Sequence, residues 1–229
     1  MKKVLIVETN VTRYKGTKEA TGLWLGEAAE FVDELNKAGI DYDFVSPKGG
    51  FVPLDPRGMN YTDESIISVY EDPDFVHRGL TNTLKPAEVN PDDYFAVYYT
   101  GGHGVMWDFP DNKELQLIAK EIYTHDGYLV SVCHGIAGLL NIKDDNGNYL
   151  IANKSITGFT TAEEILAGKK SVVPFLNKEL AEKNGAIFKK KRFYKDYAIK
   201  DGRIITGQNP FSVRSVAKLL VNEGTLGGN

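Results

Sequence analysis

The sequence of 229 residues contains a single cysteine, Cys133. One cysteine cannot form a disulfide within the chain, which is typical of a protein kept in a reducing compartment. Long apolar runs are also missing near the beginning, where the short run Val4–Val7 ends at Glu8. Such a run is too short for the core of a signal peptide or for a membrane span. We therefore expect a cytoplasmic protein that does not associate with membranes.

The sequence also lacks an excess of positive charge. Its 27 lysines and arginines are outnumbered by 31 aspartates and glutamates, for a net charge of -4. This balance gives no electrostatic reason to expect nucleic acid as a partner, and the basic run Lys189–Arg192 fits a solvated face. Neither a G-x-G-x-x-G motif nor a P-loop is present, so no nucleotide cofactor is expected. His77 and His125 do not stand at ligand spacing from His103, so no metal is expected either.

The chain does contain short β-branched runs that alternate with amphipathic stretches. This alternation predicts an α/β fold with a mainly parallel sheet sandwiched by helices, and without a linker or repeat it predicts a single domain over residues 1–229. Strands are expected at Val4–Val7, Tyr42–Ser46, Tyr94–Tyr99, the run ending at Val132, Ser155–Gly158, Ile187–Phe188, Tyr197–Ile199 and Ile204–Ile205. Helices are expected at Leu23–Lys37, Asn112–Thr124, Thr161–Ala167, Phe175–Asn184 and Phe211–Glu223.

Residues 49–92 interrupt this rhythm. The segment is rich in proline and has few periodic runs, apart from a short helix predicted near Asp63–Val69. A structureless stretch of this length is uncommon inside a compact domain. We expect an inserted segment with short elements of its own, lying over the edge of the sheet or over the site.

The stretch Tyr128–Gly138, which reads Y-L-V-S-V-C-H-G-I-A-G, carries the strongest chemical signal. The apolar run ending at Val132 suits a strand buried on both faces, and the small residues after Gly135 can begin a helix. Cys133 at such a turn resembles the nucleophile elbow of hydrolases, and the helix amides facing it would favour thiolate over thiol. The alternative is a buried structural cysteine, which is common for this residue type.

Several further motifs occur in order around this stretch. They are G-L-W-L-G-E at Gly22–Glu27, T-G-G-H-G-V-M-W-D at Thr100–Asp108, S-V-C-H-G at Ser131–Gly135, S-I-T-G-F-T-T-A-E-E at Ser155–Glu164 and T-G-Q-N-P-F-S at Thr206–Ser212. With these motifs the chain resembles the DJ-1/PfpI (ThiJ) superfamily, and more narrowly its heat-shock chaperone and glyoxalase III branch. The resemblance covers nearly the whole chain and implies the flavodoxin-like fold shared with class I glutamine amidotransferases.

The resemblance also assigns roles to single residues. It implies that Cys133 is the nucleophile and that His134 is its neighbour in a Cys-His-acid triad. The acid falls on one of two adjacent glutamates, of which Glu164 fits the family spacing better than Glu163. The sequence thus predicts a triad whose third member is uncertain by one position.

Glu27 by itself reads as a solvated surface carboxylate. The resemblance instead places it against the cysteine, where burial would raise its pKa towards neutrality and suit it to proton shuttling. The resemblance further implies that the backbone amides of Gly102 and His134 bind an oxyanion. His103 and Trp107 are expected to bind substrate, with a supporting role or metal ligation for His103 and a core position for Trp107 left open.

A thiol beside a histidine and a carboxylate, with an oxyanion-binding pair, suits attack on a carbonyl carbon. The resemblance implies a cofactor-independent glyoxalase III-like lyase, which converts methylglyoxal or another 2-oxoaldehyde to lactate through a cysteine thiohemiacetal in defence against carbonyl stress. Two alternatives stay open: a cysteine hydrolase acting on peptides, amides or glycation adducts, and a non-enzymatic stress chaperone or oxidation sensor. The expected partners are the small 2-oxoaldehyde and, for a chaperone, unfolded clients, and a homodimer is an open alternative to a monomer.

Overall fold

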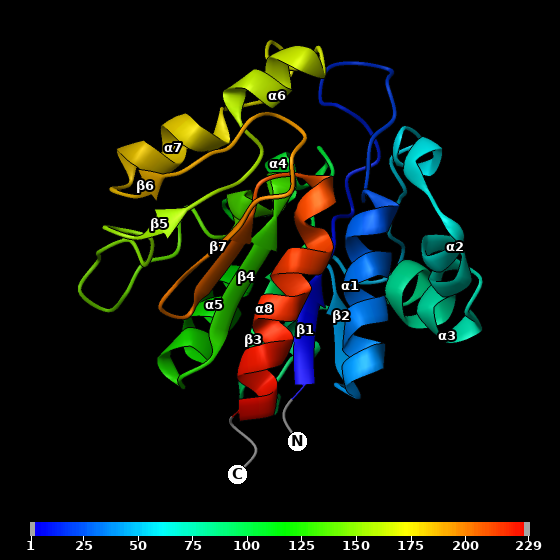
Figure 1. Cartoon of the computed structure of the whole chain (residues 1–229), viewed down its shortest axis with the longest axis horizontal. Coiled ribbons are helices and arrows are strands. Elements are labelled where there is room, and N and C mark those ends of the chain that lie inside the picture. Colours follow the sequence, from blue (N-terminus) through cyan, green and yellow to red (C-terminus); the bar gives the residue numbers. More distant parts are fainter. Residues whose placement is uncertain (1–2, 227–229) are drawn as a thin grey trace.

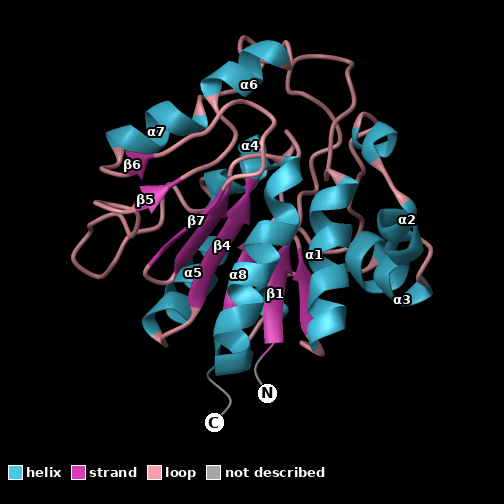
Figure 2. Cartoon of the chain, viewed as in Figure 1, coloured by secondary structure: helices cyan, strands magenta, loops and turns pink. Residues whose placement is uncertain are grey.

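The computed structural model describes residues 3–226, and its centre is a six-stranded sheet (Figures 1 and 2). The strand order is β2-β1-β3-β4-β8-β7, and every neighbouring pair is parallel except β7 with β8. The bounds are β1 Lys3–Val7, β2 Tyr42–Val45, β3 Tyr94–Tyr99, β4 Tyr128–Val132, β7 Ala198–Asp201 and β8 Ile204–Gly207. The prediction of an α/β fold with a mainly parallel sheet is confirmed.

Helices cover both faces of this sheet (Figure 1). The residues of a buried strand point alternately to the two faces, so Val4 and Ile6 of β1 join one core cluster while Leu5 and Val7 join the other. The first cluster lies under α1 and α8, and the second lies under α5. Their bounds are α1 Leu25–Ala38, α8 Val213–Leu226 and α5 Lys113–Thr124.

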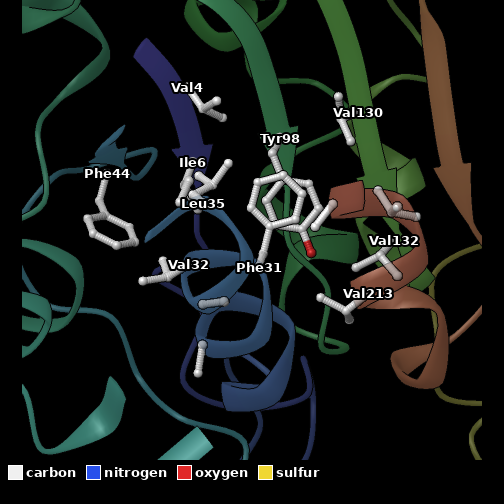
Figure 3. Close-up of a cluster of buried hydrophobic side chains, with 14 of the residues drawn as sticks. Val4, Ile6, Phe31, Val32, Leu35, Phe44, Tyr98, Val130, Val132 and Val213 are labelled. Atoms are coloured by element: carbon white, nitrogen blue, oxygen red, sulfur yellow. The ribbon is translucent and has the colours of Figure 1, made fainter. Parts of the chain in front are cut away.

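The core on the α1 side fixes the N-terminal half of α1 against the sheet (Figure 3). Phe31 of α1 stacks on Tyr98 of β3 with 3.6 Å between the ring centroids. The Tyr98 hydroxyl donates a hydrogen bond of 2.8 Å to the backbone carbonyl of Glu27. This packing holds the first turn of α1 at the carboxyl ends of β3 and β4, where open parallel sheets commonly place their ligands.

A second, two-stranded sheet pairs β5 with β6 in parallel, apart from the central sheet. Between these two strands the chain forms a well-capped helix, α6. Thr160 accepts a hydrogen bond from the backbone amide of Glu163, and the Glu163 carboxylate accepts in return from the Thr160 amide. This capping box fixes the direction in which α6 presents its first turn. The bounds here are β5 Ser155–Ile156, β6 Ile187–Phe188, α6 Thr161–Leu166 and α7 Asn177–Lys183.

The segment 49–92 forms short helices that pack beside α1 and the edge strand β2 (Figure 1). They are η1 Gly58–Tyr61, α2 Glu64–Tyr70, α3 Pro73–Phe75, the π-helix η2 Val76–Thr81, η3 Pro86–Glu88 and η4 Pro91–Asp93. The remaining helices are α4 Val105–Asp108, η5 Cys133–Gly138 and η6 Pro210–Ser212. Within residues 3–226, no helix has both the length and the apolar character needed to cross a membrane.

Candidate active site

Cys133 lies at the junction of β4 and η5 with a backbone φ of 56°. Residues other than glycine rarely adopt this left-handed conformation, so the turn is strained. The close approach of the chain also requires glycine nearby, because a Cβ at Gly135 would lie 2.2 Å from the carbonyl oxygen of Tyr99. Cys133 is only 3% exposed, and it lines a cavity. The single cysteine therefore occupies a nucleophile elbow.

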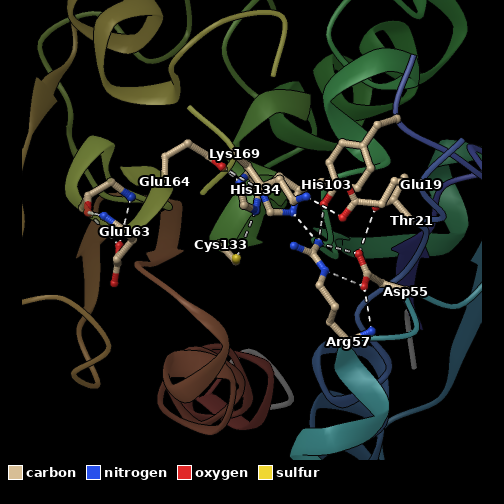
Figure 4. A network of polar contacts seen from close by, with 12 residues as sticks. Glu19, Thr21, Asp55, Arg57, His103, Cys133, His134, Glu163, Glu164 and Lys169 are labelled. Atoms are coloured by element: carbon tan, nitrogen blue, oxygen red, sulfur yellow. Dashed lines mark hydrogen bonds and ion pairs between the residues drawn. The ribbon is translucent and has the colours of Figure 1, made fainter. Parts of the chain in front are cut away.

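His134 and Glu164 lie next to the thiol (Figure 4). Nδ1 of His134 is 3.4 Å from Sγ of Cys133, and Nε2 is 2.8 Å from Oε2 of Glu164. Burial opposes ionisation of Glu164, but two histidines outweigh it and hold the pKa of this carboxyl well below its usual range. The ionised carboxylate only accepts hydrogen bonds, so Nε2 of His134 carries a proton and Nδ1 presents its lone pair to the thiol.

Glu163, the neighbour of Glu164, does not contact the histidine. Its Oε1 accepts from the backbone amide of Tyr194 and from the side chains of Gln208 and Asn209, at 2.9 to 3.0 Å. Its Oε2 accepts from the backbone and hydroxyl of Thr160. Glu163 thus ties α6 to the loop of Tyr194 and to the end of β8, and of the two adjacent glutamates only Glu164 faces His134.

Glu27 is fully buried in the first turn of α1. Its Oε2 accepts a 2.6 Å hydrogen bond from the backbone amide of Gly101, where a side chain would lie only 2.4 Å from the same oxygen. Its Oε1 is buried and has no hydrogen-bond partner in the described part of the chain. Burial raises the pKa of Glu27 to about 8, and the Cys133 thiol is close enough for each group to shift the pKa of the other.

The surroundings of Cys133 favour its thiol over its thiolate. Burial raises its pKa well above the ordinary value, and the Glu27 carboxyl raises it further. The backbone amide of His134 lowers this pKa without offsetting those effects. The predicted effect of the helix amides is therefore present, but burial of the sulfur and the Glu27 carboxyl outweigh it at this six-residue 3-10 helix.

His103 also contacts Glu164, through the carboxylate oxygen that does not face His134. Its Nε2 is 2.7 Å from Oε1 of Glu164, and the two imidazole rings lie 4.0 Å apart. Its Nδ1 is 2.9 Å from Nη2 of Arg57, a residue of the inserted segment. Arg57 is held in turn by Asp55, to which Nε and Nη2 donate at 3.0 and 2.7 Å. Glu164 therefore accepts from two histidines, one facing the thiol and one facing a guanidinium (Figure 4).

The cavity in front of the thiol has a volume of about 980 Å³. Gly102, His103 and His134 line it, and Gly102 needs to be glycine because its φ is 97° and a Cβ would lie 2.1 Å from the carbonyl oxygen of Gly22. Trp107 does not line the cavity and packs edge-on against Tyr14, with 5.8 Å between the ring centroids. The aromatic residues that line it are Trp24, Tyr61, Phe159, Tyr194 and Phe211.

A sequence model of the DJ-1/PfpI family matches residues 21–223. The chain belongs to the DJ-1/PfpI family. The glutathione-independent glyoxalase HSP31 of Saccharomyces cerevisiae is 38% identical to it, with 94% of this chain and 95% of that protein covered. Glyoxalase 3 of Candida albicans is 34% identical, with 95% and 96% covered.

Solved structures also superpose on this member of the DJ-1/PfpI family. The structure of Rapid Encystment Protein 24 KDa from Francisella tularensis superposes with a TM-score of 0.93 at 35% identity, covering 97% of this chain and 98% of that one. Glyoxalase III from Candida albicans superposes with a TM-score of 0.84 at 29% identity, covering 96% of each chain. These matches over almost the full length place the chain in the HSP31 and glyoxalase III branch, as its motifs indicate.

His103, His134 and Glu164 have the composition of a metal site, and one ligand atom from each lies within 4.8 Å of the others. Each imidazole, however, directs Nε2 at the ionised carboxylate, so each Nε2 carries a proton. A protonated ring nitrogen has no lone pair to donate to a metal. The arrangement therefore fits a hydrogen-bonded cluster better than a metal site.

Sequence reasoning missed Arg57 and Asp55 altogether. Both belong to the inserted segment, where no periodicity points to a site. One available signal was the pattern T-T-A-E, because a threonine followed three residues later by glutamate is a capping box. That pattern ties Glu163 to the cap at Thr160 and leaves Glu164 as the glutamate free to face the histidine.

Proposed function

We propose that this member of the DJ-1/PfpI family is a glyoxalase III-like lyase that converts methylglyoxal and related 2-oxoaldehydes to 2-hydroxy acids without glutathione. The observation that carries the proposal is the fully buried carboxyl of Glu27, which lies close enough to the thiol of Cys133 for the two groups to shift each other's pKa. A carboxyl with a pKa of about 8 has the basicity to move a carbon-bound proton near neutral pH. Hydrolysis of an amide does not require a second base at this position, because His134 already serves the thiol.

The first step is addition of Cys133 to the aldehyde carbon, C1. The thiol proton passes to Nδ1 of His134 across 3.4 Å while the sulfur–carbon bond forms. The carbonyl electron pair moves to oxygen, which the backbone amides of Gly102 and His134 are proposed to bind. His134 then returns the proton to this oxygen, and the product is a thiohemiacetal.

The second step is isomerisation. The Glu27 carboxylate removes the proton from C1, a C1–C2 double bond forms, and His134 relays the proton of the C1 hydroxyl to the C2 oxygen, which gives an enediolate. Glu27 then returns its proton to C2, and the C1 oxyanion becomes the carbonyl oxygen of a thioester of a 2-hydroxy acid. C1 is oxidised and C2 is reduced by the same amount, so the step consumes no external oxidant. Water, with His134 as base, then hydrolyses the thioester and restores the thiol.

The test is lactate formation from methylglyoxal by purified protein in thiol-free buffer. The expected outcome is turnover by the wild type and none by Cys133→Ala, because the covalent intermediate cannot form. In D₂O the lactate should carry deuterium at C2, since the proton on Glu27 can exchange with solvent before its return. Lactate production that survives Cys133→Ala would contradict the proposal.

The size of the cavity favours a second candidate, hydrolysis of a larger amide or glycation adduct. Volumes of roughly 300–1,000 Å³ accommodate drug-sized ligands, whereas methylglyoxal is far smaller than the cavity of about 980 Å³. The same thiol and histidine could then form an acyl-enzyme. Release of a chromophore from peptide or amide substrates, measured beside lactate formation on one preparation, separates the two: a hydrolase turns over the amide and leaves methylglyoxal unchanged.

A further inference from the structure

Arg57 is anchored before it reaches the site. Its guanidinium donates to the fully buried Asp55 through Nε and Nη2, and Asp55 also accepts from the hydroxyl of Thr21 at 2.9 Å. The same Nη2 donates to the hydroxyl of Tyr14, whose side chain is buried. These contacts fix the orientation of the Arg57 guanidinium. Its Nη2 lies 2.9 Å from Nδ1 of His103.

The two partners of His103 determine where its proton lies. Nη2 of Arg57 has two N–H groups, shared among Asp55, Tyr14 and His103, and it cannot accept, so Nδ1 of His103 faces it without a proton. The Glu164 carboxylate offers only acceptors, so Nε2 must donate and carry one. His103 is therefore a neutral imidazole in one tautomer, held between a permanent cation and an anion.

We propose that Arg57 is a positioning residue that fixes the tautomer of His103 and adds to the burial that keeps this ring neutral, so that His103 gives Glu164 one hydrogen bond and leaves His134 as the only imidazole that takes a proton from Cys133. The inference rests on the proposed function in so far as it concerns turnover. It extends the site to the inserted segment, which supplies Arg57 and its anchor Asp55.

The alternative state shows what Arg57 prevents. A protonated His103 would form a full ion pair with Glu164 and would place a positive charge in the ring that lies 4.0 Å from His134. Both changes disfavour a proton on His134 and so weaken it as a base for the thiol. In the structure burial lowers the pKa of His103 to about 4, and His134 and Arg57 act in the same direction against the effect of Glu164. The titratable or charged residues in contact with His103 are Arg57, Glu164, His134 and Tyr14. These residues in turn contact Asp55 and Lys169, and Lys169 pairs with Glu19.

The pH dependence of kcat/KM tests the inference. The variant Arg57→Met is combined with Asp55→Asn, so that no buried carboxylate loses its partner. His103 should then be protonated at a higher pH than in the wild type, although burial and His134 still lower its pKa, and the ratio of variant to wild-type kcat/KM should fall as the pH is lowered from about 7.5 to about 5. Adding His103→Gln should abolish that fall, because the amide can still donate to Glu164 but does not titrate. Arg78→Met, which removes an arginine of the same segment that pairs with Asp74, is the matched control.

A second comparison avoids any change at Arg57. His103→Leu removes the donor to Glu164 and should lower kcat/KM about ten- to a hundredfold, the usual range for a hydrogen bond to a charged group. His103→Gln should recover most of this loss. If glutamine is as damaging as leucine, or if the ratio for the Arg57 variant does not change with pH, the inference is wrong.

The protonation state of His103 can also be read without turnover. In full-length protein with ¹⁵N-labelled histidine, the wild type should show a His103 ring protonated only at Nε2 from about pH 5 to about pH 8. The Arg57→Met/Asp55→Asn variant should show this ring gaining a second proton at a higher pH than the wild type, because one of the charges that oppose this proton is removed. A wild-type His103 that titrates near pH 6.5 overturns the inference even if lactate is formed, and a fixed tautomer supports it even if lactate is not.

Discussion

Glu27 and Glu164 are both buried glutamates close to Cys133, yet their pKa values move in opposite directions. Burial raises the pKa of Glu27 to about 8, because the Cys133 thiol and the backbone amide of Gly101 offset only part of its effect. Burial acts on Glu164 as well, but two imidazoles outweigh it and keep the carboxyl ionised. Residue type and burial alone therefore do not decide the charge of an acid at this site; the donors that surround it do. One carboxyl is suited to exchanging a proton and the other to holding a charge.

Replacing Glu27 should have the largest effect. Glu27→Gln leaves Cys133 able to add to the aldehyde but removes the base for isomerisation, so kcat should fall by at least about a hundredfold. The wild-type kcat/KM should rise with pH towards about pH 8, since Glu27 acts as a base only when ionised and its pKa is about 8. Single-turnover assays on methylglyoxal measure the loss, and Glu114→Gln, an exposed glutamate of α5, is the control. Near-normal lactate formation by Glu27→Gln would move the base role to His134.

Replacing Glu164 should have a smaller effect on turnover and an opposite effect on the thiol. In Glu164→Gln one imidazole loses its acceptor, because the amide nitrogen is a donor, and kcat/KM should fall about ten- to a hundredfold. Alkylation of Cys133 by iodoacetamide at about pH 8 should become slower, since His134 is a weaker base. The same reaction should become faster in Glu27→Gln, because the Glu27 carboxyl raises the thiol pKa. If the alkylation rate changed equally in Glu164→Gln and Glu27→Gln, the two glutamates would not act in opposite directions on the thiol.

The parts of the site that lie on regular elements could be predicted from sequence, and the parts that depend on packing could not. The apolar run before Cys133 and the small residues after it are local signals. The structure has the strand-to-helix turn at the position that these signals predict. The pKa of Cys133 also depends on burial and on Glu27, which is distant in sequence, and both outweigh the amide effect that the sequence predicts. Arg57 reaches His103 from a segment whose short helices have too few turns to show a periodic pattern. Trp107 stands beside a site motif but faces Tyr14, because neighbours on a helical turn point in different directions.

Glu163 provides a structural counterpart to Glu164 one position away. Its carboxylate accepts hydrogen bonds from Thr160, Tyr194, Gln208 and Asn209. Glu163→Gln would turn one of its oxygens into a donor facing other donors, which should lower the free energy of unfolding by about 1–3 kcal/mol while kcat/KM falls less than in Glu164→Gln. Urea unfolding and steady-state kinetics on the same preparations measure both quantities, with Glu179→Gln on α7 as the exposed control. A kinetic loss that exceeds that of Glu164→Gln would place Glu163 in the chemistry.

Glu8, at the end of β1, extends the comparison to an acid with no partner at all. Both of its carboxyl oxygens are buried without a hydrogen bond in the described part of the chain, and burial raises its pKa well above the ordinary value. A raised pKa in the folded state means that the stability present below the unfolded pKa of about 4.3 is progressively lost as the pH rises towards the folded pKa. Glu8→Gln does not titrate. The free energy of unfolding of Glu8→Gln minus that of the wild type should therefore increase above about pH 4.3. The increase should be up to about 1.4 kcal/mol per pH unit, until the folded pKa of Glu8 is reached.

Urea unfolding of the wild type and Glu8→Gln at about pH 4.5, 6 and 8 measures this difference. Taking the difference between the two proteins at each pH cancels the titration of Glu27, Glu164 and the other acids, provided that Glu8 does not interact with them. Activity should change little, because Glu8 does not line the cavity. A difference in stability that stays constant with pH would mean that Glu8 ionises normally in the folded protein, and that a buried carboxyl here needs no visible donor to keep its charge.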